Sequence, residues 1–189
     1  MPILGVIDSG KSGHLTPAAL LAYDSIGTVT VGSGGASSVT FSSIPSTYTH
    51  LQIRFIGRYT IDTRNLYFDY NGDTTNSNYY FHSLTGDGST ASAGGTQLPI
   101  IGNDAIASSA QTASVFGVGV IDILDYANTS KNKTSRSLTG CDSSGSGNVK
   151  LGSCLWISTS AISSITLKPQ SGLGANFALY SSFALYGIR

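Results

Sequence analysis

The sequence predicts an all-β protein, an antiparallel β-sandwich of jelly-roll type preceded by a short N-terminal extension that carries one short helix. Three observations predict this fold class. Apolar and polar residues alternate over many short segments, as they do in strands with one buried face. Turns rich in Gly, Asn and Ser separate those segments. Beyond the extension, no long stretch has the period of a helix, which favours a sandwich over a mixed fold.

The segment 28–55 shows the alternation most clearly. Two alternating runs are joined through Gly32–Gly35, and a turn containing Pro45 leads into a third run. Residues two apart in a strand point to the same face, so the apolar members of each run share one face and mostly polar residues take the other. The apolar members are Val29 and Val31, then Val39 and Phe41, then Leu51, Ile53 and Phe55.

The same pattern continues to the C-terminus. We expect strands at about residues 26–32, 37–43, 49–58, 65–70, 79–85, 96–101, 115–126, 133–141, 149–158, 162–168 and 176–188. We expect turns at Gly32–Gly35, Asn71–Asp73, Gly86–Gly88, Gly94–Gly95, Ser144–Gly147 and Pro169–Gly172.

Two of these strands have distinctive patterns. The run from Val115 to Tyr126 is apolar on both faces and contains alternating glycines, which predicts a central strand with another layer packed closely against it. The last strand repeats Phe-Ala-Leu-Tyr at 177–180 and 183–186. A strand that reaches the final residue is normally central, because a terminal edge strand would fray. The even spacing predicts Phe177, Leu179, Phe183 and Leu185 on one face, and Tyr180 and Tyr186 on the other.

The N-terminal extension, residues 1–24, differs from the β-sandwich domain predicted for residues 25–189. Thr16 followed by Pro17 is typical of a helix start, and a helix of one or two turns is expected at about 16–23. An apolar segment too short to fold alone needs a surface to lie against. That surface is either its own domain or a partner, and the pattern does not separate the two. The candidate anchoring residues are Ile3, Leu4, Val6, Ile7, Leu20 and Leu21.

The composition narrows the range of partners. The chain of 189 residues is long enough for one buried core, and 11% of its residues are charged against about 25% in average soluble domains. Its net charge is +0 and its basic residues form no long run, which argues against a nucleic-acid partner. No apolar stretch approaches the length of a membrane span, so membrane insertion is not expected, and the N-terminus lacks the pattern of a signal peptide.

The segment Gly5–Ser12 matches the phosphate-loop pattern G-x-x-x-x-G-K-[ST]. Such a loop follows a buried strand and opens into a long helix within a parallel sheet. Only Met1–Leu4 precede this match, Gly13 and Pro17 interrupt any helix after it, and no alternating βαβ pattern follows. We therefore interpret the match as coincidence and expect no nucleotide cofactor.

Residues with catalytic potential are scattered. His14, His50 and His82 lie far apart and have no nucleophile in a recognisable context, so a triad is not predicted. His50 and His82, both in strand patterns, are expected to be cross-strand or surface residues. Asp122 and Asp125 fall on opposite faces of one strand and cannot face each other as a carboxylate pair. No catalytic residue is therefore expected.

One loop could gather oxygen ligands for a cation. Its spacing is not that of a known calcium loop, which favours a plain turn and no metal. The residues concerned are Asp69, Asn71, Asp73 and Asn76.

The two cysteines, Cys141 and Cys154, are predicted on neighbouring strands joined through Ser144–Gly147. They could lie nearly opposite each other and within disulfide reach. Synthesis in a reducing compartment favours free, buried thiols. A bond formed later, within the chain or to a neighbouring protein, stays open.

Several blocks of the chain together carry a resemblance. They are Ser25–Gly35, Phe41–Pro45 with Thr49–Arg54, Asp122–Asn128 and Phe183–Ile188. Distributed over residues 25–189, they resemble a family of small virion structural proteins of tailed bacteriophages. The resemblance implies a tail-fibre or virion-surface protein with a jelly-roll-like domain, assembled in the host bacterial cytoplasm, usually as a homotrimer, and without catalytic residues.

Three classes of function follow. The first is a non-enzymatic virion structural protein, on a tail fibre or baseplate with other virion proteins as partners, or on the capsid as a decoration protein. The second is a module that binds host surface glycans by stacking sugars on tyrosines, although core packing explains the same tyrosines equally well. The third is a polysaccharide depolymerase, which would need an acidic pair that the pattern lacks. The tyrosines are Tyr59, Tyr67, Tyr70, Tyr79 and Tyr80.

Overall fold

The computed structural model describes residues 22–189 except residues 64, 104–105, 144 and 171–173. Within these residues the chain is all-β, with a single turn of 3-10 helix, η2 (Asn76–Asn78). The strands are β1 (Tyr23–Thr30), β2 (Val39–Phe41), β3 (His50–Gly57), β4 (Asn65–Tyr70), β5 (Tyr79–Gly86), β6 (Ala91–Thr96), β7 (Ile100–Asn103), β8 (Gly117–Leu124), β9 (Lys133–Ser143), β10 (Ser146–Trp156), β11 (Ile165–Pro169) and β12 (Ser182–Ile188).

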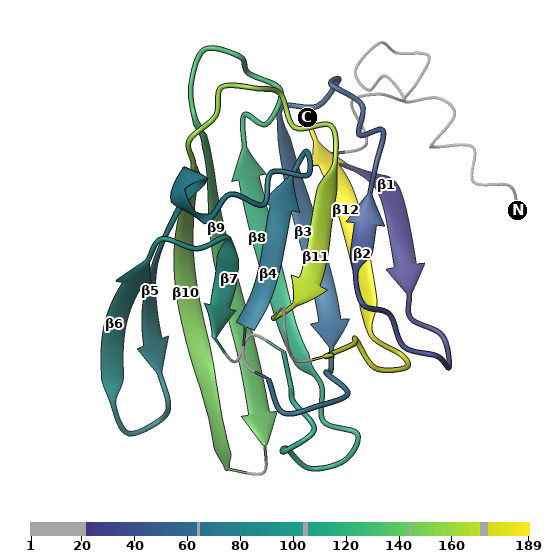
Figure 1. The fold of residues 1–189 in the computed structure, drawn as a ribbon, viewed down its shortest axis with the longest axis vertical. Coiled ribbons are helices and arrows are strands. Elements are labelled where there is room, and N and C mark those ends of the chain that lie inside the picture. The colour runs from purple at the N-terminus through teal and green to yellow at the C-terminus, as the bar shows by residue number, and fades with distance from the viewer. Residues whose placement is uncertain (1–21, 64, 104–105, 144, 171–173) are drawn as a thin grey trace, which may run out of the picture.

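The strands form two antiparallel sheets that lie face to face (Figure 1). The large sheet has the order β1-β12-β3-β8-β9-β10-β5-β6, and the small sheet has the order β2-β11-β4-β7. In Figure 1 the small sheet lies in front of the central part of the large sheet, and the β5–β6 hairpin extends beyond it. One face of the large sheet therefore packs on the small sheet and the other faces away from it.

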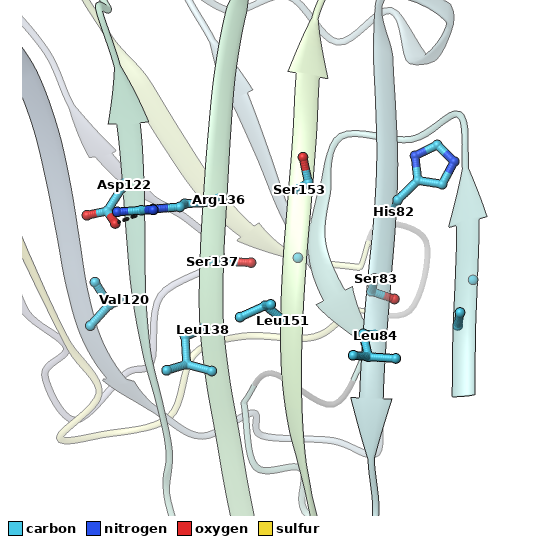
Figure 2. Close-up of a pocket in the computed structure, with 13 residues that line it drawn as sticks. His82, Ser83, Leu84, Val120, Asp122, Arg136, Ser137, Leu138, Leu151 and Ser153 are labelled. Atoms are coloured by element: carbon cyan, nitrogen blue, oxygen red, sulfur yellow. Dashed lines mark hydrogen bonds and ion pairs between the residues drawn. The ribbon is translucent and has the colours of Figure 1, made fainter. Parts of the chain in front are cut away.

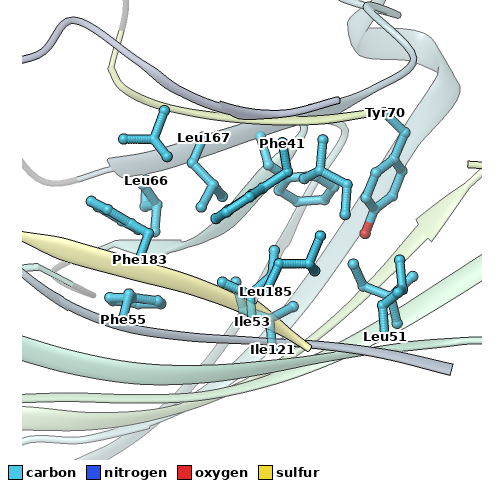
Figure 3. Close-up of a cluster of buried hydrophobic side chains, with 14 of the residues drawn as sticks. Phe41, Leu51, Ile53, Phe55, Leu66, Tyr70, Ile121, Leu167, Phe183 and Leu185 are labelled. Atoms are coloured by element: carbon cyan, nitrogen blue, oxygen red, sulfur yellow. The ribbon is translucent and has the colours of Figure 1, made fainter. Parts of the chain in front are cut away.

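The core fills the space between the two sheets (Figure 3). Leu51 and Ile53 of β3 and Leu185 of β12 point inward from the large sheet, and Leu66 and Leu167 point inward from the small one. Each of these side chains is at most 1% exposed, so each contributes about 1.5–3 kcal/mol through burial. The inward residues follow the alternation seen in the sequence.

Most of the predicted strands are confirmed, with shifted ends. The missed strand is β6, whose sequence Ala-Ser-Ala-Gly-Gly-Thr has no large apolar residue and whose residues are all exposed. The prediction of a turn at Gly94–Gly95 is wrong, because both residues pair with β5. Pairing with a neighbouring strand, rather than a hydrophobic pattern, holds β6 in place, and propensity alone does not detect such a strand.

The predicted last strand is too long at its start. It begins at Ser182, and Tyr180 has a φ of 72°, so the first copy of the Phe-Ala-Leu-Tyr repeat forms a turn. Leu179 is 38% exposed and does not share a face with Phe183. Phe177 still reaches the core, where its ring centroid lies 4.7 Å from that of Phe183. The central position is confirmed, since β12 lies between β1 and β3.

The run Val115–Tyr126 contains β8, which is central between β3 and β9 as predicted. A layer packs against only one of its faces. Ile121 and Ile123 point into the core, whereas Val118 is 53% exposed on the opposite face. The predicted packing of another layer against this strand therefore holds for one of its two apolar faces.

The N-terminal extension falls almost entirely on residues 1–21, which lie outside the described residues, and so do the six candidate anchoring residues and most of the predicted helix at 16–23. Tyr23 and Asp24 belong to β1, where they pair with Ile188 and Gly187. The strand thus begins two residues before the predicted domain start at residue 25. Among the described residues, no helical segment has the length and apolar character needed to cross a membrane.

Candidate functional site

The outward face of the large sheet is the candidate functional surface, and strand register determines which side chains meet there. Every strand alternates, so residues that occupy one register position on neighbouring strands form rows across the sheet. Two features result, a row of polar residues and, beside it, a group of exposed aliphatic residues.

The first feature, here called the polar row, crosses six adjacent strands at one register position. Pairing places Tyr186 opposite Gln52, Gln52 opposite Asp122, and Asp122 opposite Arg136. Arg136 in turn pairs with Ser153, which pairs with His82 on β5. The polar row is Tyr186, Gln52, Asp122, Arg136, Ser153 and His82.

Hydrogen bonds join the middle of the polar row into a network. The Asp122 carboxylate accepts from Gln52 Nε2 at 2.8 Å and from Arg136 Nε at 3.0 Å. Arg54 Nε donates to Gln52 Oε1 at 2.7 Å. The polar groups of Gln52, which is only 8% exposed, are thereby satisfied. Both carboxylate oxygens of Asp122 are engaged in this structural network.

The same network ends at an aromatic clamp. The Arg54 guanidinium lies over the rings of Tyr23 and Tyr186, with its central carbon 5.2 Å and 5.1 Å from the two ring centroids. These distances are within the range of cation–π attraction. The clamp links β1, β12 and β3 across the outward face.

The second feature, here called the apolar strip, lies beside the polar row on β3, β8, β9, β10 and β5. Register aligns Leu138 with Leu151 and Leu151 with Leu84, and a neighbouring row contains Ile56, Val118 and Val149. These side chains are 44% to 59% exposed. Contiguous exposed apolar surface of this kind is often functional, so the strip is a candidate interaction surface. The apolar strip is Ile56, Leu84, Val118, Leu138, Val149 and Leu151.

The apolar strip is hollowed. A groove of about 980 Å³ runs over Leu138, Leu151 and Leu84, bordered by residues of the polar row. Figure 2 shows the three leucines side by side, with the Asp122–Arg136 pair at one border and His82 at the other. A second hollow, of about 540 Å³, continues along Val118 and Val149. The surface is thus long and open. It is mainly aliphatic over the groove, whereas Asp87 and Asp142 also line the second hollow.

The histidines expected at the surface are not brought together. His50 Nδ1 accepts a hydrogen bond from the backbone N–H of Asp125 at 3.0 Å. His82 lies at the border of the groove, separated from His50 by β8, β9 and β10. His14 is outside the described residues. The structure therefore assembles no triad from the two described histidines.

The two aspartates at the end of β8 have separate partners. Asp122 belongs to the polar row, whereas Asp125 follows the strand with a φ of 48°. Lys131 donates a hydrogen bond to Asp125, and this bond together with the positive charge of Lys131 lowers the pKa of that carboxyl. Each carboxylate is thus paired with a cation rather than with the other.

The oxygen-rich loop after β4 is held in place by an ion pair and hydrogen bonds within the chain. Asp69 pairs with Lys168 at 2.8 Å. The Asn71 side-chain oxygen accepts backbone N–H groups of Ser163 and Ser164 at 2.8 Å and 3.1 Å. The interpretation of Asn71–Asp73 as a plain turn is confirmed by the positive φ of Asn71 and the turn bond Asp73 N–H to Tyr70 O. Among the described residues, no group of three metal-ligating side chains is present.

The tyrosines considered for stacking on sugars lie mainly in the core. Tyr59, Tyr70 and Tyr79 are at most 2% exposed. Tyr67 is half-buried. Tyr80 is 41% exposed, and its hydroxyl accepts a hydrogen bond from Gln97 Nε2 at 2.8 Å. Core packing, rather than sugar stacking, is thus the role of the three buried rings.

Both cysteines are buried and neither is in a disulfide. The β9–β10 register pairs Cys141 with Asn148 and Cys154 with Ser135, so the two thiols are six residue positions apart along the hairpin. At about 3.4 Å per residue this is roughly 20 Å, far beyond disulfide reach. The expectation that they lie nearly opposite is wrong, and the preference for reduced, buried cysteines is confirmed.

The apolar strip was missed by sequence reasoning. Its residues alternate with small polar residues just as inward-facing residues do, and the alternation itself does not say which set faces the core. On β9 the buried set is the polar one, Ser135, Ser137 and Thr139, which the sequence pattern does not indicate. Leu138 therefore points outward by register.

Fold and surface together define an all-β protein whose large sheet has one open face with a group of exposed aliphatic side chains. Searches with family models, against curated proteins and against solved structures find no match for this chain.

Proposed function

We propose that this protein is a non-enzymatic structural protein of a tailed-bacteriophage virion, carried on a tail fibre or baseplate, where it contributes to host attachment. The observation that carries the proposal is the outward face of the large sheet. It offers six exposed aliphatic side chains for contact with another surface, while the neighbouring carboxylate of Asp122 is engaged by Gln52 and Arg136. The resemblance of residues 25–189 to small virion proteins points to the same function.

The strand order supports a jelly-roll fold for this subunit. When the β5–β6 and β9–β10 hairpins are set aside, the remaining eight strands alternate between the two sheets along the chain, except that β4 and β7 follow each other within the small sheet. They then form two four-stranded sheets, β1-β12-β3-β8 and β2-β11-β4-β7. Eight strands in two facing sheets are the arrangement of a jelly roll. The two hairpins are additions that widen the large sheet.

The subunit assembles as a homo-oligomer, in the form of a homotrimer. Natural β proteins guard their sheet edges with charge, proline, bulges or short strands. The small sheet has short edge strands, and β1 has a bulge between Ser25 and Gly27. The β6 edge, Ala91–Thr96, has neither charge nor proline. Assembly into a closed ring protects such an edge.

The N-terminal extension attaches the subunit to the particle. Its candidate anchoring residues are apolar, and full burial of each would contribute about 1.5–3 kcal/mol. Several of them together are sufficient to hold a subunit on a partner. The residues are Ile3, Leu4, Val6, Ile7, Leu20 and Leu21.

The test is removal of residues 1–21 followed by measurement of folding and of incorporation into phage particles. The deletion stops before Tyr23, because β1 needs Tyr23 and Asp24 for its pairing with β12. We expect a folded protein that no longer enters the particle. The matched variant keeps the full length and replaces Ile3, Leu4, Val6 and Ile7 with Ser, and we expect the same loss. Normal incorporation of both proteins would refute the anchor, and absence of the intact protein from purified particles would refute the virion assignment.

A further inference from the structure

We propose that the apolar strip is the surface through which copies of this chain associate, with strip packed against strip. The inference rests on the proposed homo-oligomer but not on the location of the protein in a virion. It names the contact surface, which the resemblance to virion proteins does not specify.

The size of the apolar strip fits this role. It crosses five adjacent strands, from β3 to β5, and two rows of side chains. With strands about 4.8 Å apart it is roughly 24 Å wide and about 15 Å high, on the order of 400 Å². A standard interface buries about 800 Å² on each partner, with an apolar centre and a polar rim. The strip supplies such a centre, and the polar row supplies one side of the rim.

Charge also favours a second copy as the occupant. The charged pair that borders the groove is satisfied within the subunit, since Asp122 pairs with Arg136 at 3.0 Å and also accepts from Gln52. The groove can therefore be covered without a counter-charge from the partner at this border. Because the net charge of the chain is +0, copies approach each other without long-range repulsion.

The side chains that form the groove are suited to an apolar protein surface rather than to a sugar. Apart from His82, every side chain that the described residues contribute to its lining is non-aromatic, and Leu84, Leu138 and Leu151 form its floor. Sugars are bound by flat aromatic rings together with polar groups, whereas aliphatic side chains interdigitate with similar side chains across a dry interface. In the proposed trimer, the three strips face a common axis and cover one another.

The experiment compares single substitutions inside and outside the strip. Leu138→Asp and Leu151→Asp place a carboxylate at its centre, where both side chains are more than half exposed in the isolated subunit, so the fold is retained. The matched control is Ile157→Asp, which changes a side chain that is 44% exposed and lies outside both hollows. The solution mass is measured by light scattering and sedimentation over a range of concentrations, with circular dichroism to check folding.

We expect the intact protein and Ile157→Asp to be oligomers of the same size. Each strip variant should be a folded monomer, with a dissociation constant raised by at least about a hundredfold, because a buried unpaired carboxylate opposes association. Strip variants that stay oligomeric at the same concentrations would overturn the inference while leaving the homo-oligomer intact. A dimer that the strip variants dissociate would support the strip and overturn the trimer.

An intact protein that is monomeric throughout would overturn both. In that case the protein lacking residues 1–21 is compared with the intact chain for binding of a fluorescent apolar dye. Increased dye binding after the deletion would identify the extension, rather than a second copy, as the cover of the strip.

Discussion

The indole Nε1 of Trp156 donates a hydrogen bond to Oδ2 of Asp73 at 2.8 Å, and this bond ties the end of β10 to the loop that follows β4. The same oxygen accepts from Asn78 Nδ2 at 2.8 Å, and Asp73 O accepts from the hydroxyl of Tyr79. Beneath the loop, the ring of Tyr79 stacks on that of Trp156 with centroids 6.4 Å apart. One carboxylate thus fixes a loop, a strand end and an aromatic cluster.

Replacement of this carboxylate should make stability less dependent on pH. Burial raises the pKa of Asp73, but hydrogen bonds from Trp156, Asn78 and Thr75 outweigh it, and the net pKa is lowered. A lowered pKa in the folded state stabilises the protein above the unfolded value, near pH 4, and this contribution is lost as the pH falls through the folded value. We expect Asp73→Asn to reduce the free energy of unfolding by about 1–2 kcal/mol at pH 7.

The measurement is urea unfolding of both proteins between pH 7 and pH 3. The difference between them should be constant above about pH 5 and should shrink below about pH 4. A difference that grows toward acid pH would contradict the role given to the Asp73 carboxylate.

A methyl group at residue 119 should destabilise the core. A Cβ on Gly119 would lie 2.3 Å from Phe55 Cζ and 2.9 Å from Thr139 Cγ2, so both neighbours would have to move. We expect Gly119→Ala to lower the free energy of unfolding by about 1–3 kcal/mol. The control is Gly32→Ala, because no heavy atom lies within 4 Å of a Cβ there. Equal thermal unfolding midpoints for the two variants would show that the Phe55 ring does not pack directly against Gly119.

The thiols should resist modification until the protein unfolds. Both cysteines are buried, and burial raises the pKa of Cys154 to about 12, so almost none of this thiol is ionised at pH 8. We expect no mass increase with iodoacetamide at pH 8 in the native protein and two adducts per chain in denaturant. A mass two daltons below that of the reduced chain would instead indicate a disulfide. A thermal unfolding midpoint that falls when reductant is added would indicate the same.

The match to a phosphate loop at Gly5–Ser12 should bind no nucleotide. A phosphate loop works within a parallel βαβ unit, and every paired strand in the described part of the chain's sheets is antiparallel. We expect titration calorimetry with Mg-ATP to give no saturable heat for either the intact protein or Lys11→Ala. Saturable binding that disappears in Lys11→Ala would show that the loop is functional.

The alternation of apolar and polar residues was sufficient to predict the strands that bury one face. Leu51, Ile53 and Phe55 alternate in the sequence and all reach the core, because a strand with one buried face must repeat every two residues. The alternation did not predict a strand whose residues are all exposed, because such a strand needs no apolar face. The edge strand β6 has exposed, small residues, and only its ladder with β5 makes it a strand.

The candidate functional surface could not be predicted from the sequence of any single strand. The sequence by itself determined an all-β chain with few charges and short antiparallel strands, because these follow from short-range alternation and turn chemistry. Tertiary structure alone decided which face of β9 is inside. Ser137 lies opposite Ile121 and Leu138 opposite Val120, so once Ile121 enters the core the register sends Leu138 outward. A shift of one residue would reverse both faces, and only the packing of the neighbouring strands selects between the two.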